Sequence, residues 1–158
     1  MLRLTQILAP TDFSEYSSYA LRHAAELARQ FGAKLVLLHV VSNEALESIS
    51  KAHVPPHPVD KVYEDLDQET REQYANHVPP EVRKVLETEV LVLPGVPFLE
   101  IVRAARLKGV DLIVMATHGR TGLSHALVGS VTEKVVRKAP CPVLSIRPVG
   151  AEAIAHAA

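Results

Sequence analysis

Cysteine and tryptophan are nearly absent from this sequence, whose 158 residues include one cysteine, Cys141, and no tryptophan. A single cysteine cannot form a disulfide within the chain, and a chain without disulfides suits a reducing compartment, so we expect a cytoplasmic protein. A chain of this length buries about 70% of the surface that its unfolded form exposes. It therefore needs neither a disulfide nor a structural metal ion to fold.

Long hydrophobic runs and an excess of either charge are missing too. No stretch reaches the roughly 20 apolar residues that a transmembrane helix needs, and the apolar run at the N-terminus is too short for a signal peptide. The formal net charge is −1, from 17 basic and 18 acidic residues. Because non-specific binding to nucleic acid or to a membrane surface requires a basic surface, we expect neither partner.

Two glycine-rich motifs of common nucleotide-binding enzymes are also missing. No Gly-x-x-x-x-Gly-Lys-Ser/Thr segment occurs, which argues against a P-loop NTPase. No Gly-x-Gly-x-x-Gly segment follows the first apolar run, which argues against a dinucleotide-dependent oxidoreductase. A zinc site is not expected either, because prolines separate His53 from His57 and prevent helical spacing, and no cysteine lies nearby.

What the sequence does contain is five short apolar runs, which predict five β-strands. The runs are rich in Val, Ile and Leu and do not alternate strictly with polar residues. This pattern is typical of strands covered on both faces, as in a parallel sheet. The expected strands are residues 4–9, 34–41, 87–93, 111–116 and 142–147.

The segments between these strands carry apolar residues at helical spacing. Ser14 and Gly32 are suitable start and stop signals for the first helix. Pro97 can occupy the first turn of the third helix, and Gly109 can end it. The expected helices are residues 15–31, 60–76, 97–108 and 129–138.

The alternation of strands and helices predicts a doubly wound α/β fold, a parallel sheet with helices on both faces. We expect one domain over residues 1–148 and an alanine-rich tail at 149–158. Residues 42–60 include the proline-rich segment 53–58, and we interpret them as an insertion or a flexible loop. In such sheets ligands bind beyond the carboxyl ends of the strands, where the strand order reverses.

Asp12 stands just after the first strand. A carboxylate there can accept a hydrogen bond from a ribose hydroxyl or approach a magnesium ion that accompanies a nucleotide. The alternative is that Asp12 or Ser14 only caps the helix that follows. His39 lies inside the second strand, and we interpret it as a hydrogen-bonded core histidine rather than a ligand.

The segment after the fourth strand, residues 116–132, is rich in small and polar residues. Glycine lets the backbone approach a phosphate closely, and the free N–H groups of a helix N-terminus favour an anion. Ser130 and Thr132 add hydroxyl groups and Arg120 adds a positive charge. The segment therefore fits a phosphate site, and the alternative is a flexible loop with a helix cap at Ser130.

Three segments together resemble the universal stress protein family. They are Ile7-Leu8-Ala9-Pro10-Thr11-Asp12-Phe13-Ser14, then Leu37-Leu38-His39-Val40-Val41, and the stretch from Met115 to Leu144. The resemblance covers nearly the whole chain. It implies the strand order 3-2-1-4-5, so that the Asp12 turn and the glycine segment face each other. It also implies a homodimer, with the apolar edge strand 142–147 pairing with that of a second copy.

Nucleotide-binding members of this family carry Gly-x-x-Gly, nine residues and then Gly-Ser/Thr. Gly119, Gly129 and Ser130 match this motif, whereas Ala116 replaces its first glycine. The extra methyl group matters only where the backbone needs a positive φ or touches the ligand closely, so we expect ATP binding to be reduced or retained. The resemblance implies an adenine pocket lined by Pro10, Thr11, Val40 and Met115, with Asp12 near the adenosine or ribose. It also implies a phosphate site formed by Gly119, Arg120, Gly129, Ser130, Val131 and Thr132. His118 lies in the same segment and either contacts phosphate or packs against the turn.

The function that these features favour is ATP binding, with or without magnesium, by a stress-response or regulatory protein. Slow ATP hydrolysis, or phosphate transfer to a serine or threonine of the chain itself, is compatible with the same residues. The replacement of glycine by Ala116 keeps an alternative open, a protein-interaction module of the same fold that binds no nucleotide.

Overall fold

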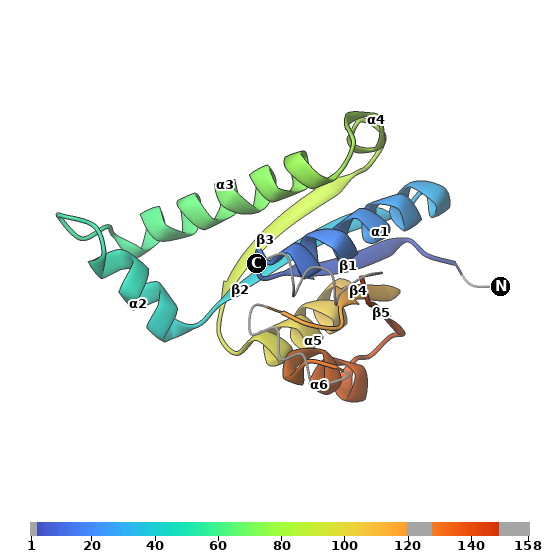
Figure 1. The fold of residues 1–158 in the computed structure, drawn as a ribbon. Coiled ribbons are helices and arrows are strands. Elements are labelled where there is room, and N and C mark those ends of the chain that lie inside the picture. The colour runs from blue at the N-terminus through green and yellow to red at the C-terminus, as the bar shows by residue number, and fades with distance from the viewer. Residues whose placement is uncertain (1–2, 120–127, 149–158) are drawn as a thin grey trace.

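The computed structural model describes residues 3–119 and 128–148, and its centre is one parallel sheet with the strand order β3-β2-β1-β4-β5 (Figure 1). The strands are β1 (Gln6–Thr11), β2 (Lys34–Val41), β3 (Thr88–Pro94), β4 (Leu112–Ala116) and β5 (Val143–Ile146). The predicted doubly wound fold and its strand order are confirmed. The order reverses between β1 and β4, which lie side by side.

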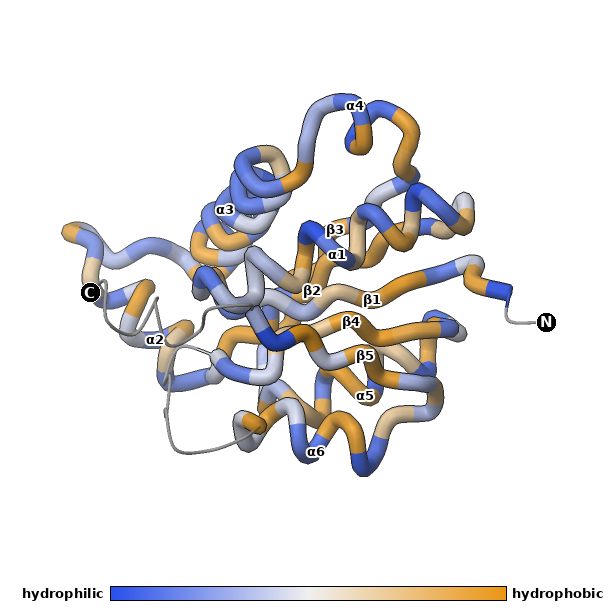
Figure 2. Tube along the Cα trace, turned by 45° about the vertical axis from the view of Figure 1, so that its right-hand side comes forward, coloured by the Kyte–Doolittle hydropathy of each residue, from blue (hydrophilic) through white to orange (hydrophobic). Residues whose placement is uncertain are grey.

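Helices cover both faces of this sheet, and the apolar strands lie between them (Figures 1 and 2). Successive strand residues pack on opposite sides, since Ile7 contacts the α1 side and Leu8 the α5 side. Coverage on both faces explains why the strands are continuous apolar runs. Helices α1 (Glu15–Phe31), α3 (Val59–His77) and α4 (Pro80–Arg83) lie on one face, and α5 (Pro97–Lys108) and α6 (Ser130–Lys138) lie on the other. No helix within 3–119 and 128–148 is long and apolar enough to cross a membrane.

The helix ends follow the predicted signals. The hydroxyl of Ser14 accepts a hydrogen bond from the N–H of Ser17 and caps α1. Gly32 and Gly109 end α1 and α5 in the left-handed conformation, each with φ of 63°. Pro97 occupies the first turn of α5, where its missing N–H has no helical partner to lose.

Residues 42–60 differ from the expectation of an insertion or flexible loop, because they include helix α2 (Asn43–Lys51). The hydroxyl of Ser42 caps this helix by accepting a hydrogen bond from the N–H of Ala45. The helix has nine residues, none of them fully buried, and a helix this short gives only two turns of apolar pattern to read from the sequence. The proline-rich segment 53–58 that follows is not helical, as predicted.

Strand β1 extends beyond its predicted end at Ala9 and includes Pro10 and Thr11. The Thr5 carbonyl accepts a hydrogen bond from the first residue of β2, and the Gln6 carbonyl accepts one from the residue before β4. Since sides alternate along a parallel strand, Pro10 faces β4. Because β1 pairs with β4 only as far as Leu8, no hydrogen bond between these strands is lost through the missing N–H of Pro10. The two strands thus continue without pairing towards their carboxyl ends.

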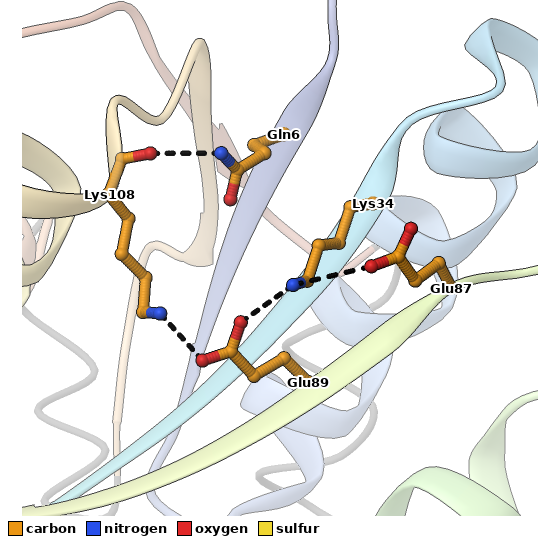
Figure 3. Close-up of polar contacts among 5 residues, drawn as sticks. All are labelled: Gln6, Lys34, Glu87, Glu89 and Lys108. Atoms are coloured by element: carbon orange, nitrogen blue, oxygen red, sulfur yellow. Dashed lines mark hydrogen bonds and ion pairs between the residues drawn. The ribbon is translucent and has the colours of Figure 1, made fainter.

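The amino ends of the strands are tied together by ion pairs (Figure 3). The Lys34 ammonium lies 2.8 Å from a carboxylate oxygen of Glu89 and 3.4 Å from one of Glu87. The Lys108 ammonium lies 2.6 Å from the other Glu89 oxygen, and the Gln6 amide donates to the Lys108 carbonyl. Lys108 and then Lys34 hold the pKa of Glu89 below its ordinary value. These pairs join β2, β3 and α5 at the end opposite to the candidate site.

Candidate functional site

A cavity of about 300 Å³ lies at the carboxyl ends of β1 and β4, where the strand order reverses. Twelve of the predicted site residues line it, and Arg120 lies outside the described residues. The predicted residues in its lining are Pro10, Thr11, Asp12, Val40, Met115, Ala116, His118, Gly119, Gly129, Ser130, Val131 and Thr132. The structure therefore brings together two segments that are more than a hundred residues apart in the sequence.

Four further lining residues, Ser17, Leu38, Pro97 and Ile101, were not predicted. Two of them follow from periodicity. Leu38 lies two positions before Val40 on β2, and residues at this spacing share a face of the sheet. Ile101 belongs to the buried stripe of α5. Together with Met115 they give one part of the cavity an apolar lining.

Asp12 lines the cavity and is also bonded within the turn before α1. Its Oδ1 accepts a hydrogen bond from the N–H of Ser14 at 3.0 Å, so it closes the turn between β1 and α1. Its Oδ2 lies against the backbone of Gly119, where a Cβ atom would be only 2.5 Å away. Only glycine therefore allows the carboxylate its present position beside the cavity.

The N-terminus of α6 forms the polar side of the cavity. Gly129 is the residue before its first turn, and no side chain caps the helix. The first N–H groups of a helix have no acceptor within it and carry the positive end of its dipole. The exposed hydroxyl of Ser130 stands at the same place. An anionic group at this position would meet donors and a favourable field.

Gly129 also joins the start of α6 to the residue that follows β4. Its N–H donates to the carbonyl of Thr117 at 2.6 Å, and a Cβ on Gly129 would lie 3.1 Å from that oxygen. Its φ is −67°, which any residue adopts, so the close approach of two backbones is what requires glycine here.

Thr132 and Ala116 join α6 to the end of β4. The Thr132 hydroxyl donates to the Ala116 carbonyl at 2.8 Å, and both residues are buried. The hydroxyl proton of Thr132 is therefore engaged within the protein. Ala116 does not have a positive φ, so alanine replaces the glycine of the family motif without backbone strain.

The remaining polar lining comes from hydroxyl and imidazole groups. The hydroxyls of Thr11 and Ser17 lie 3.1 Å apart and are buried. Nδ1 of His118 lies 3.0 Å from the Thr117 hydroxyl, and its ring is tilted against that of Tyr16 with centroids 6.1 Å apart. Asp12 and His118 are the titratable groups that the described part of the chain contributes to the cavity lining.

A metal site built by side chains alone is not found in the described ranges, which contain no group of three or more His, Cys, Asp or Glu residues suited to an ion. The rings of His53 and His57 stack face to face with centroids 3.6 Å apart, and neither residue lines the cavity. Cys141 is partly buried, and burial raises the pKa of its thiol, which makes it a poor nucleophile.

Comparison with known proteins agrees with this fold. Residues 4–147 match the model of the universal stress protein family. The chain is 32% identical to universal stress protein MJ0577 of Methanocaldococcus jannaschii over 90% of this chain and 94% of that protein. It is 34% identical to universal stress protein YxiE of Bacillus subtilis over 90% and 98% of the two chains.

Solved structures show the same fold. The structure of MJ0577 superposes with a TM-score of 0.73 over 94% of this chain and 99% of that chain, at 32% identity. A universal stress protein in complex with cAMP (TM-score 0.65, 20% identity, 93% and 99% covered) shares the fold alone. The same holds for the protein from Archaeoglobus fulgidus in complex with dAMP (0.61, 23%, 92% and 99%). With a family match over nearly its whole length, this chain belongs to the universal stress protein family.

Proposed function

We propose that this protein binds an adenine nucleotide, with ATP as the preferred ligand, and acts as a regulatory protein of the stress response. One observation carries the proposal. A single cavity joins an apolar part, lined by Leu38, Val40 and Met115, to the uncapped N-terminus of α6. A nucleotide has the same division into an apolar base and an anionic tail. Two proteins of the same fold hold adenine nucleotides, cAMP and dAMP.

The parts of the ligand are assigned by the chemistry of the lining. We assign the base to the apolar part between Pro10, Val40 and Met115. The ribose hydroxyls suit the carboxylate of Asp12, which accepts hydrogen bonds. The phosphates suit the N-terminus of α6, beside Ser130. Gly119 and Arg120 complete the proposed phosphate site.

Regulation fits the site better than dedicated catalysis. Asp12 already accepts the N–H of Ser14, and His118 contacts the Thr117 hydroxyl. Neither geometry prepares a general base for an attacking water. One carboxylate supplies a single ligand, so magnesium would be held mainly by the phosphates, with Asp12 beside it. We therefore propose at most slow hydrolysis, and a nucleotide that biases one conformation or assembly of the protein.

A homodimer through β5 is part of the proposal. Strand β5 (Val143–Ile146) is at the edge of the sheet and pairs with β4 on one side. Leu144 of this strand is 40% exposed. An edge strand with an apolar residue invites pairing with a second copy.

The location of the protein in the cytoplasm also stays a prediction.

Calorimetric titration of nucleotide-free protein with Mg-ATP, AMP and GTP tests the function. Saturable binding of ATP, with weaker binding of GTP, supports an adenine site. The Gly129→Val variant should bind ATP about tenfold or more weakly, because a side chain there displaces the start of α6 from the Thr117 carbonyl. Ala75→Val adds the same side chain on an exposed position of α3 and should bind as the wild type does.

Absence of binding at millimolar ATP would overturn the proposal. The alternative, a protein-interaction module that uses no nucleotide, would then account for the chain better. Normal ATP binding by Gly129→Val would place the phosphates away from the start of α6.

A further inference from the structure

Phe13 lies beside the candidate site but does not line it. Its φ is 63°, and it is the one non-glycine residue in the described ranges with a positive φ. A bulky side chain rarely adopts this left-handed conformation, so other contacts must hold Phe13 there. Those contacts come from His39 of strand β2 and from an apolar cluster of β2 and α3, against which α2 also packs.

The contact with β2 is made by His39. Its ring stacks on that of Phe13 with centroids 4.2 Å apart and an angle of 27° between the planes. Its Nδ1 lies 2.9 Å from the carbonyl oxygen of Thr11, the last residue of β1. Because a carbonyl oxygen only accepts, Nδ1 carries the proton. His39 is 8% exposed, so it holds both the end of β1 and the Phe13 ring from inside the protein.

The contact with the helices is a small apolar cluster separate from the two clusters on the faces of the sheet. Its buried members are Val41, Val62 and Leu66, and Phe13, Ala45, Leu46, Ile49, Tyr63 and Val92 pack against them. Helix α2 has no fully buried residue of its own. The packing of α2 therefore depends on this cluster, to which Phe13 contributes a whole aromatic ring.

The backbone of Phe13 is part of the turn that orients Asp12. The N–H of Phe13 donates to the Thr11 hydroxyl at 3.1 Å, and the N–H of Ser14 donates to Oδ1 of Asp12 at 3.0 Å. Asp12 thus stands between two residues whose N–H groups are bonded within the same turn. The backbone of Phe13 is therefore in the turn that holds Asp12 beside Gly119.

From this chain of contacts we propose that Phe13, held by His39, is a positioning residue that couples the nucleotide site to helix α2. The inference rests on the proposed function. Coupling is reciprocal, so a ligand that favours the present position of Asp12 must also favour the packing of α2. Occupancy of the site is then transmitted to a helix on the surface, some thirty residues further along the chain.

One substitution separates the effect of the Phe13 ring from that of its backbone, and a second serves as its control. Phe13→Asn removes the ring but keeps a residue type that tolerates the left-handed conformation. It should weaken ATP binding about tenfold. Val82→Ala removes methyl groups from the core cluster of α1 and α4, outside the cavity lining, and serves as a destabilised control. It should bind ATP as the wild type does at a temperature where both are folded.

Hydrogen exchange of the α2 amides, residues 43–51, measures the coupling directly. In the wild type and in Val82→Ala, saturating Mg-ATP should slow exchange in α2 several-fold. In Phe13→Asn, saturating Mg-ATP should leave α2 unchanged. If Phe13→Asn does not fold, Ile49→Ala loosens the same cluster from the side of α2 and should weaken ATP binding in the same direction.

The outcomes distinguish the two proposals. Wild-type protein that binds ATP without any change in α2 exchange, or Phe13→Asn that binds as tightly as the wild type, overturns the coupling and leaves the proposed function standing. Wild-type protein that binds no nucleotide overturns the proposed function and the coupling with it.

Discussion

Asp12 and Gly119 are far apart in the sequence but lie side by side at the cavity, and substitutions of both residues can test this contact. A methyl group on residue 119 would lie 2.5 Å from Oδ2 of Asp12, which is the mobile end of a side chain. In Gly119→Ala the carboxylate should therefore rotate away while the fold persists. We expect the Kd for ATP to rise about tenfold with little change in Tm.

A double-mutant cycle supplies the control for this prediction. If Gly119→Ala acts by displacing the Asp12 carboxylate, adding it to Asp12→Ala should not raise the Kd for ATP any further, because no carboxylate remains. Calorimetric titration of the four proteins gives the comparison. Additive losses would mean that the methyl group obstructs the ligand itself and not Asp12.

Other residue roles needed the structure, because the same residue type serves several purposes. Thr132 and Gly129 stay predicted residues of the phosphate site. The structure adds that the Thr132 hydroxyl donates to the Ala116 carbonyl and that the Gly129 N–H donates to the Thr117 carbonyl. His39 is hydrogen-bonded and buried, as its place inside a strand predicted.

The start of helix α6 depends on the buried hydroxyl of Thr132, which is 3% exposed. Thr132→Val keeps the shape of the side chain and leaves the Ala116 carbonyl without this donor. The free energy of unfolding should fall by about 1–2 kcal/mol, the cost of an unsatisfied buried acceptor. Thr132→Ser keeps the hydroxyl and should lose less. Urea denaturation measures both, and a Val variant as stable as the wild type would contradict the role of this bond.

The ion pairs between β2, β3 and α5 give stability a defined pH dependence. The pKa of Glu89 is lowered in the folded protein, by Lys108 first and Lys34 second. Its contribution is therefore fully present above the ordinary glutamate value of about 4.5 and is lost as the pH falls through the lower folded value. Glu89→Gln should be less stable at pH 7 by up to about 1 kcal/mol, since the pairs are partly exposed.

Urea denaturation of both proteins from pH 7 down to pH 3 tests this dependence. The difference in unfolding free energy between wild type and Glu89→Gln should shrink below about pH 4.5. Asp111, whose pKa is lowered by its bonds to Thr5, titrates in both proteins and cancels in the comparison. A difference that stays constant with pH would show that Glu89 contributes no charge-dependent stability.

Elements with strong periodicity and clear end signals were predictable. Helices α1 and α5 occupy the predicted residues, since each has a long apolar stripe and a glycine at its end. Helix α2 escaped prediction because it is short and packs against a cluster built from residues of β2 and α3, which the local sequence does not show. The end of β1 was predicted too early, because a proline often marks the end of a strand. Proline disrupts a strand only where its N–H would be hydrogen-bonded to a neighbour.

At the scale of the whole molecule, the exposed edge of the sheet determines the expected assembly. We expect the wild type to be a dimer at micromolar concentration and Leu144→Glu to be a monomer, because a charge on β5 opposes pairing of two such edges. Light scattering coupled to size exclusion measures both. Leu107→Glu introduces the same charge at a leucine of α5 that is 75% exposed and should remain a dimer. A monomeric wild type would contradict the β5 interface.

The sequence by itself determined the strands, most of the helices and the alternation that makes a doubly wound sheet, since these depend on local periodicity and on residues at element ends. The motifs around Asp12 and Gly119 also identified the family. Only the tertiary structure decided which atoms are already bonded within the site, and that Phe13 stacks on His39 and packs against the same apolar cluster as α2. Those features arise from contacts between distant segments, whose geometry depends on how the whole chain packs.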